Sequence, residues 1–332
     1  MINIAVDAMG GDYAPKEQVE GAMLAIRDFE DVHITLYGDE STLKKYLRDD
    51  TRVDIVHTTS TIDMGEKDPI HAIRGNRDSS MARALESVRQ EKNDAVVSSG
   101  ATQALIAGAH ILVGRMKKMK RTAIAPVIPT APGGKMVLLD SGGNLEIKPE
   151  YMVQQAYFAS IYAEEILGIE SPRVGLINIG TEEGKGRDLD NEAYRLFKEN
   201  DNIRFYGNVE PKDVLNPPAD ILISDGFTAN IVMKTIEGTA KGMGDMLKQE
   251  MMRGISGKIV SALALRKLKR FKRRLDPAEI GGAMIYGLRG VVIKAQGSSR
   301  RDGFYNAIRQ ASDIVRQDVI AKVADIIEQE GA

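Results

Sequence analysis

Six short loops of small and polar residues follow apolar runs of the chain and contain most of the residues that could perform chemistry. They are DAMGGD at 7–12, SSGAT at 98–102, DSGGN at 140–144, NIGTEEGKG at 178–186, SDG at 224–226 and QGSS at 296–299. Glycine lets backbone N–H groups approach an anion closely, and helix N-termini favour negative charge. Several such loops in one chain predict a site for a phosphate-like anion.

Each of these loops also has a purely structural interpretation. Paired glycines after a strand are common in turns that need positive φ. Lys185 could be a solvated loop residue, and the serines near 298 could cap a helix that begins near Arg301. Capping or turn formation could equally explain Asp7, Asp140, Asp225, Ser298 and Ser299.

Several kinds of chemistry find no support in the sequence. The chain has no cysteine, which excludes disulfides, thiolate metal sites and a thiol nucleophile, and its four histidines are scattered. The GKG at 184–186 lacks the spacing of a P-loop, and no GxGxxG opens a helix after the first strand. We therefore expect neither a metal nor a bound cofactor.

The elements that must position the loops alternate between strands and helices. Apolar, β-branched runs predict strands at 2–6, 32–37, 53–56, 95–97, 136–139, 174–177, 203–205, 221–223 and 291–293. Helical periodicity fills the intervals, and Pro15 is placed for a first helical turn. This alternation predicts an α/β protein with three α/β/α layers and a mostly parallel sheet. Ligands bind at the carboxyl ends of such strands, so the six loops could share one crevice.

The length of 332 residues is consistent with one large α/β unit made of two lobes. Pro126, Pro129, Pro132 and the pair at 133–134 form the clearest break in composition. We place a large lobe at 1–125 plus 285–332 and a small lobe at 126–284.

Charge is distributed unevenly. The net charge of −2 gives no support for general nucleic-acid binding. However, there is no acidic residue between Glu250 and Asp276, and seven of the nine residues from 266 to 274 are Lys or Arg. Apolar residues recur at helical spacing within 258–275, so we expect a basic amphipathic segment that faces something negative. No apolar run is long enough to span a bilayer, and we expect a cytoplasmic protein.

An ordered set of motifs resembles the PlsX family of phosphate acyltransferases from residue 2 to about residue 312. The motifs are DAMGGDYAP at 7–15, IRGNRDSSM at 73–81, VSSGAT at 97–102, LLDSGGNLEIKPE at 138–150, RVGLINIGTEEGKG at 173–186, GNVE at 207–210, SDGFTANIVMKTIEG at 224–238 and IGGAMIYGLRGVVIKAQGSS at 280–299. The resemblance implies an isocitrate-dehydrogenase-like fold related to phosphotransacetylases, and a homodimer formed through the small lobe at 126–284. It also implies acyl transfer from acyl carrier protein to orthophosphate, giving acyl phosphate for an integral-membrane glycerol-3-phosphate acyltransferase.

The chain departs from the usual family pattern in three places. SSGATQA replaces SAGNTGA, GFTAN replaces GFVGN, and QGSS replaces HGSS; the residues concerned are Ala101, Gln103, Ala229 and Gln296. No Asn or His at those positions can be essential in this chain.

The residues suit direct attack of bound phosphate on the thioester, because cysteine and an evident Ser–His pair are both missing. Catalytic roles are expected for Lys185, Asn178, Asp225 and Asn230: the lysine would offset charge, the asparagines would donate hydrogen bonds, and Asp225 or Asp12 would orient groups or act as a base. Phosphate and substrate contacts are expected from Asp7, Gly10, Gly11, Asp12, Ser98, Asn144, Lys148, Gly180, Glu182, Ser298 and Ser299.

The basic segment has two candidate partners, an anionic membrane surface and the acidic acyl carrier protein. The contacts would come from Ile259, Val260, Leu263, Leu268, Arg270, Phe271 and Arg273. The resemblance implies peripheral membrane association, whereas a dimer-interface helix with a solvated basic edge would explain the same pattern.

Three other functions remain open on the residues alone. A phosphotransacetylase would use acyl-CoA as donor, and a β-decarboxylating dehydrogenase would need metal carboxylates and a nicotinamide site. A non-catalytic membrane adaptor would bind vesicles without consuming a thioester.

Overall fold

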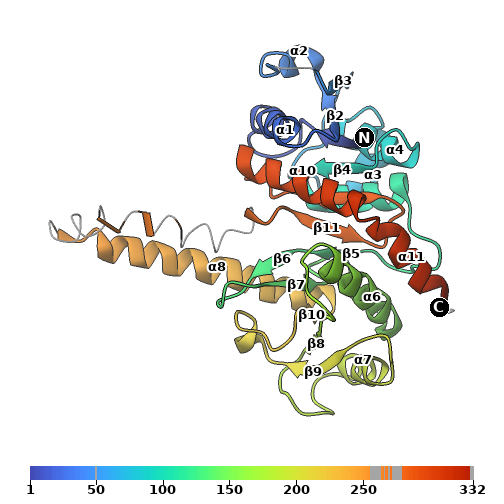
Figure 1. Ribbon diagram of the computed structural model, residues 1–332, viewed down its shortest axis with the longest axis vertical. Coiled ribbons are helices and arrows are strands. Elements are labelled where there is room, and N and C mark those ends of the chain that lie inside the picture. The colour runs from blue at the N-terminus through green and yellow to red at the C-terminus, as the bar shows by residue number, and fades with distance from the viewer. Residues whose placement is uncertain (49–50, 255–262, 265, 268–269, 271–278, 330–332) are drawn as a thin grey trace.

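The computed structural model describes residues 1–48, 51–254, 263–264, 266–267, 270 and 279–329. Its strands form two sheets, one of seven strands and one of five. Figure 1 shows the larger sheet with its helices in the upper half of the view and the smaller sheet in the lower half. The chain passes from the first sheet to the second at Pro126 and later returns to the first.

The larger sheet has the strand order β3-β2-β1-β4-β12-β11-β5. Its strands are β1 (Ile2–Asp7), β2 (Val32–Gly38), β3 (Val53–His57), β4 (Ala95–Ser98), β5 (Ala123–Ala125), β11 (Ala283–Tyr286) and β12 (Val291–Lys294). The five strands from β3 to β12 are parallel, whereas β11 pairs antiparallel with both β12 and β5. The carboxyl ends of β1, β4 and β12 therefore lie side by side.

The smaller sheet has the order β6-β7-β10-β8-β9. Its strands are β6 (Val127–Pro129), β7 (Lys135–Leu139), β8 (Val174–Ile177), β9 (Phe205–Val209) and β10 (Ile221–Ile223). Four strands are parallel, and β6 pairs antiparallel with β7 at one edge. The carboxyl ends of β7, β10 and β8 are neighbours.

Helices cover both faces of the larger sheet because successive strand residues point to opposite sides. The helices are α1 (Lys16–Asp28), α2 (Glu40–Leu43), α3 (Pro69–Gly75), α4 (Ser80–Arg89), α5 (Thr102–Gly108), the π-helical turn η1 (Ala109–Val113), α6 (Pro149–Glu165), α7 (Asp188–Lys198), the 3₁₀ turn η2 (Pro211–Asp213), α8 (Gly226–Met251), α10 (Arg301–Arg316) and α11 (Val319–Gln329). On β1, Ile4 and Val6 pack with α1 and α10, whereas Ala5 packs with α4, α5 and η1. These three layers confirm the predicted fold class.

Helix α6 joins the two sheets into one core. Phe158 of α6 stacks on Tyr286 of β11 in the larger sheet, with ring centroids 4.3 Å apart. The same helix packs against β10 and β7 of the smaller sheet. The apolar core is therefore continuous between the sheets.

Helix α8 extends well beyond the body of the molecule (Figure 1). Its first turns bury Ala229 and Val232, but every residue from 238 to 250 is exposed. Met243 and Met246 are 66% and 71% exposed.

Two expectations about the strands were wrong. The strand expected at 203–205 begins at Phe205 and continues to Val209, because Gly207 and Asn208 conceal its apolar pattern. The single sheet edge expected for the six loops is divided between two sheets. The short strands β5, β6 and β11 were not predicted.

Candidate active site

Three of the six loops meet around Asp7 at the end of the larger sheet and form the first cluster. This carboxylate is 1% exposed and accepts 2.6 Å hydrogen bonds from the hydroxyls of Ser80 and Ser98. Burial raises the pKa of Asp7, and the two serine hydroxyls oppose that rise. Asp7 therefore organises the first turn of α4 and the end of β4 around itself.

The loop after β1 approaches the loop after β4 so closely that only glycine fits at residue 10. A Cβ on Gly10 would lie 2.5 Å from Asp7 Oδ2 and 2.8 Å from the backbone nitrogen of Gly100. The carbonyl of Gly10 accepts hydrogen bonds from Gln18 Nε2 at 2.7 Å and from Ser99 Oγ at 2.8 Å. Gly11 follows beside the same Ser99 hydroxyl.

The third loop, after β12, completes this cluster. The backbone N–H of Asp12 donates to the carbonyl of Gly297 at 2.9 Å. Ser299 is buried and its backbone N–H bonds to Gln296, whereas Ser298 is exposed. Neither serine caps α10, whose N-cap residue is Arg300, so the capping explanation for them is wrong.

The other three loops meet at the end of the smaller sheet and form the second cluster. Asp140 stabilises the turn after β7 there. Its buried carboxylate accepts hydrogen bonds from the backbone N–H groups of Gly143 and Asn144, and from Asn144 Nδ2. Burial raises the pKa of Asp140, and the bonds from Asn144 and the backbone oppose that rise. The carbonyl of Asn144 in turn accepts from the N–H of Gly226 at the start of α8.

Asp225 is the N-cap of α8. Its carboxylate accepts from the N–H groups of Phe227 and Thr228, from the Thr228 hydroxyl and from the guanidinium of Arg187. Burial alone would raise the pKa of Asp225, but Thr228 and Arg187 hold it below its usual value. With its lone pairs engaged, Asp225 positions other groups, and it is not placed to act as a base.

The loop after β8 folds over Asn178. The Nδ2 of this buried asparagine donates to the carbonyl of Lys185 at 2.9 Å and to Asn208 Oδ1 at 3.1 Å. Lys185 is exposed, and its aliphatic stem lies over Gly180, where a Cβ would be 3.3 Å from Lys185 Cγ. Glu182 is also exposed and lies beside Gly180. Asn178 therefore shapes the loop that presents Lys185.

The remaining candidates occupy the rim of this second cluster. Asn230, on the first turns of α8, is half-buried beside Gly142, with Nδ2 3.2 Å from where a Cβ would be. Lys148 is exposed at the start of α6.

Hydrogen bonds join the second cluster to the larger sheet. Asn144 Nδ2 donates to the carbonyl of Thr122, immediately before β5. Asp140 Oδ1 accepts from the N–H of Ile124 within β5, at 3.0 Å.

Helix α8 begins at the cluster around Asp140 and carries a charge that acts on the cluster around Asp7. It begins next to Asp225, and Lys234 lies nine residues further on, about 14 Å along the helix axis. There the charge of Lys234 lowers the pKa of Lys294 at the end of β12 in the larger sheet. Helix α8 therefore contacts the second cluster at its start and influences a lysine of the first cluster through the charge of Lys234.

Two basic residues of the site were missed by sequence reasoning. Lys294 ends an apolar strand, where a lysine is expected to face solvent, yet it is buried. Arg187 follows a glycine-rich loop and forms a bidentate pair with Asp190 as well as the bond to Asp225. Nothing in the spacing of the sequence indicates either contact.

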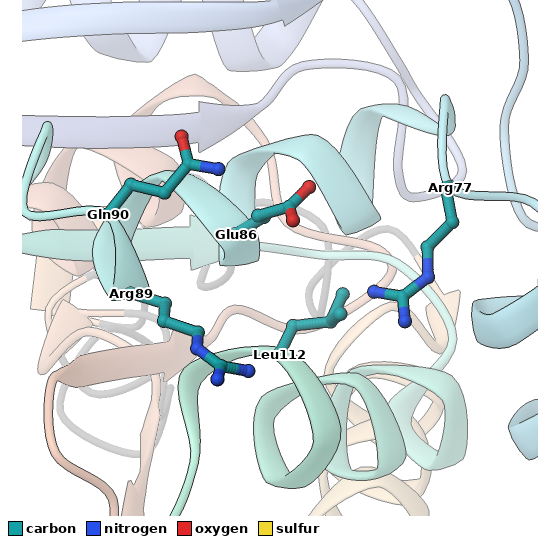
Figure 2. A pocket seen from close by; sticks show the side chains of 5 residues that line it. All are labelled: Arg77, Glu86, Arg89, Gln90 and Leu112. Carbon is teal, nitrogen blue, oxygen red and sulfur yellow. The ribbon is translucent and has the colours of Figure 1, made fainter.

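A pocket of about 430 Å³ lies away from both clusters, between α4 and η1. Figure 2 shows its lining residues, Arg77, Glu86, Arg89, Gln90 and Leu112. Its charged side chains are partly or fully exposed, and the loops after the strands do not contribute to it.

The basic amphipathic segment falls largely outside the described residues, which exclude Ile259, Val260, Leu268, Phe271 and Arg273. Leu263 is described and is 84% exposed, and Arg270 is exposed. In the described ranges, no helix combines the length and apolar character needed to cross a membrane. Nor does any group of three or more His, Asp or Glu there lie close enough to hold a metal ion.

The fold is shared with solved phosphotransacetylases. A phosphotransacetylase from Streptococcus pyogenes matches with a TM-score of 0.62 at 14% identity, covering 95% of this chain and 94% of that one. The EutD phosphotransacetylase from Staphylococcus aureus matches with a TM-score of 0.57 at 13% identity, covering 94% and 93%. The architecture is thus of the phosphotransacetylase-like α/β/α class.

Sequence comparison defines the family. The family described as fatty acid synthesis protein matches residues 2–322. A phosphate acyltransferase from Acholeplasma laidlawii (strain PG-8A) is 50% identical over 329 residues, covering 98% of both chains. Another from Geobacillus sp. (strain WCH70) is 43% identical over 328 residues, covering 99% of both. The chain belongs to the fatty acid synthesis protein family, the PlsX family that its motifs resemble, and it is an acyltransferase.

Proposed function

We propose that the protein transfers a fatty acyl group from acyl carrier protein to orthophosphate and so produces acyl phosphate for phospholipid synthesis. The observation that carries this proposal is the pair of loop clusters, one at the end of each sheet, which offer glycine backbones and lysine side chains. Relatives named phosphate acyltransferase support the acceptor. The reaction needs no cofactor.

The proposed step is a direct displacement. An oxygen of hydrogen phosphate attacks the thioester carbonyl carbon and forms a C–O bond. The C–S bond then breaks, and the departing thiolate takes up the proton that phosphate loses. Thiols leave readily, with a reference pKa near 8.5. Positioning the anion contributes about 7–11 kcal/mol, and stabilising the oxyanion contributes about 3–4 kcal/mol.

We propose the following roles for the side chains of the two clusters. Lys185, which is exposed, would offset charge on the reacting groups, and the half-buried amide of Asn230 at the same cluster would donate a hydrogen bond. Asn178 and Asp225 act as positioning residues, because their polar atoms are engaged within the protein. The backbone of residues 10–12, at the end of the larger sheet, would shape the phosphate site.

The absence of cysteine supports a mechanism without an acyl-enzyme. The test is to mix labelled acyl carrier protein thioester with the enzyme in the absence of phosphate, then quench and analyse the protein. Direct attack predicts no label on the chain, whereas a labelled ester on a serine or threonine would overturn it.

A second candidate for the acyl donor is acyl-CoA in place of acyl carrier protein. The phosphotransacetylase fold supports acyl-CoA as a second candidate donor. Comparing kcat/KM for the same acyl chain on acyl carrier protein and on coenzyme A separates the two. We expect acyl carrier protein to be preferred at least tenfold, and a preference for coenzyme A would reassign the enzyme.

We also infer that the protein works as a homodimer through α8. The outer half of this helix exposes Met243, Met246 and Leu247, and a Cβ on Gly242 would meet no atom within 4 Å. An isolated amphipathic helix of this kind gains stability by burying its apolar side chains. Sedimentation equilibrium should give twice the chain mass.

The basic segment 258–275 is proposed to hold the enzyme at an anionic membrane, where acyl phosphate would pass to an integral-membrane glycerol-3-phosphate acyltransferase. Each basic residue near such a surface contributes about 1 kcal/mol. The high exposure of Leu263 supports an apolar contact there. This would make the protein cytoplasmic and peripherally membrane-associated.

A further inference from the structure

Lys294, the last residue of β12, is a lysine held inside the protein, with 7% of its surface exposed. Its Nζ donates to the backbone carbonyls of Ser99, at 3.4 Å, and Ala295. In the described part of the chain the ammonium forms no ion pair with a carboxylate. Since an ammonium has three N–H donors, one donor is left without a partner among the described residues.

A buried cation without a contacting counter-ion is unfavourable. Burial lowers the pKa of Lys294 to about 8, even though the charges of Asp7 and Asp12 oppose that change, and Lys234 lowers it further. An anion placed beside Nζ would remove this penalty.

The surroundings of Lys294 also contain an unmet acceptor. Gln18 donates from Nε2 to the carbonyl of Gly10 and to Ser99 Oγ, and its buried Oε1 has no donor among the residues that the structure describes. Hydrogen phosphate carries negative oxygens and one hydroxyl donor. One of its oxygens can therefore accept a hydrogen bond from the ammonium of Lys294, and its hydroxyl can donate one to an acceptor such as Gln18 Oε1.

We propose that Lys294 binds the orthophosphate substrate, as counter-ion of the dianion at the carboxyl ends of β1, β4 and β12. This inference rests on the proposed function, because it takes orthophosphate as the acyl acceptor. Lys185, which belongs to the other sheet, is then left to offset the charge that develops on the thioester carbonyl. In this proposal phosphate is held at the cluster around Asp7 and the thioester at the cluster around Asp140.

The binding of phosphate should depend on pH through the charge of Lys294. The charged groups that act on Lys294 are Asp7 on β1, Asp12 in the following loop and Lys234 on α8, which is itself paired with Glu237. Below about pH 8 the ammonium is charged and phosphate binds. Above that pH the amine becomes neutral, so the KM for phosphate should rise about tenfold per pH unit.

The central variant is Lys294→Met, which keeps the unbranched stem of the side chain and removes its terminal ammonium. At pH 7 we expect the KM for phosphate to rise at least tenfold while the KM for the acyl donor changes less than twofold. The rise of the phosphate KM above pH 8 should disappear in this variant. Its melting temperature should equal or exceed that of the parent, because an unpaired buried charge has been removed.

Two further variants separate binding from folding. Lys92→Met removes an exposed lysine and should leave the phosphate KM unchanged.

Because the chain has no cysteine, Lys294→Cys can be alkylated at that position alone. Aminoethylation with 2-bromoethylamine restores an ammonium and should bring the phosphate KM back toward the parent value. Alkylation with 2-bromoethanol, which adds no charge, should not.

Calorimetric titration with inorganic phosphate, without donor, tests the site independently of turnover. We expect binding to the parent and at least tenfold weaker binding to Lys294→Met. Equal phosphate affinity in the two proteins would overturn the role of Lys294, even if the enzyme makes acyl phosphate. Loss of binding in the variant, with no acyl phosphate formed by the parent, would uphold the anion site and reject the proposed reaction.

Discussion

Arg187 and Asp225 form an ion pair that ties the loop after β8 to the first turn of α8. The same guanidinium holds Asp190 at the start of α7, and Asp190 and Asp225 together raise its pKa. One arginine therefore fixes the positions of two helices beside the loop that presents Lys185. The positions of the loops after β8 and β10 in the smaller sheet therefore depend on the contacts of Arg187.

Replacing Arg187 with Met should lower the free energy of unfolding by about 1–3 kcal/mol at pH 7, because a buried carboxylate loses a hydrogen-bonded partner. Urea denaturation measures the change. Arg195→Met, within α7, removes only exposed ion pairs and should have little effect. A loss as large in the control as in Arg187→Met would contradict the account.

The pair also predicts a dependence on acid. The pKa of Asp225 is lowered in the folded protein, so its contribution to stability is present above the unfolded pKa, near 3.9, and is lost as the pH falls through the folded value. The stability difference between the parent and Arg187→Met should therefore shrink below pH 4. A difference that stays constant down to pH 2 would show that Asp225 is not the group involved.

Lys185→Ala should reduce phosphate-dependent turnover at least tenfold. The side chain is exposed and forms no ion pair among the described residues, so the melting temperature should not change. Initial rates of thioester loss with and without phosphate measure the effect. Unchanged kinetics would remove Lys185 from the site.

Gly10→Ala should disrupt the first cluster, because the added methyl group would meet Asp7 and the backbone of Gly100 at less than 3 Å. We expect a loss of about 1–3 kcal/mol in stability together with a fall in turnover. The control is Gly75→Ala, where the nearest atom, on His71, is 3.9 Å away. Normal activity in Gly10→Ala would show that the two loops need not approach so closely.

Leu263→Glu should weaken binding to anionic vesicles while leaving turnover of soluble substrates nearly unchanged, because a charged group would replace an exposed apolar one. Co-sedimentation with phosphatidylglycerol vesicles measures binding. Leu215→Glu, at another exposed leucine, serves as the control. Equal vesicle binding by all three proteins would rule out membrane contact through this residue.

Much of the fold follows from local pattern. The alternation on β1, with Ile4 and Val6 on one side and Ala5 on the other, produces two covered faces, and the apolar runs identify eight of the strands closely. The strands that escaped prediction are short or contain poor strand formers, such as β9 with Gly207. Where tertiary pairing determines a strand, a local pattern is a weak guide.

The candidate site could be predicted only as a set of loops. Asp7 and Ser98 are the last residues of neighbouring parallel strands, which brings them together, and their hydrogen bond agrees with the expectation that strand ends meet. The burial of Lys294 depends on contacts between segments about 200 residues apart, such as its bond to Ser99. The division of the loops between two sheets depends in the same way on long-range pairing, which no local motif reveals.

The central claim is that bound orthophosphate accepts the acyl group directly. The most direct measurement is to incubate the purified protein with palmitoyl-acyl carrier protein and ³²P-labelled orthophosphate and to follow label in the lipid fraction and free thiol together. The account predicts one labelled palmitoyl phosphate for each thiol released, and no thiol release when phosphate is omitted. Thiol release at the same rate without phosphate, or with no label in the lipid, would contradict it.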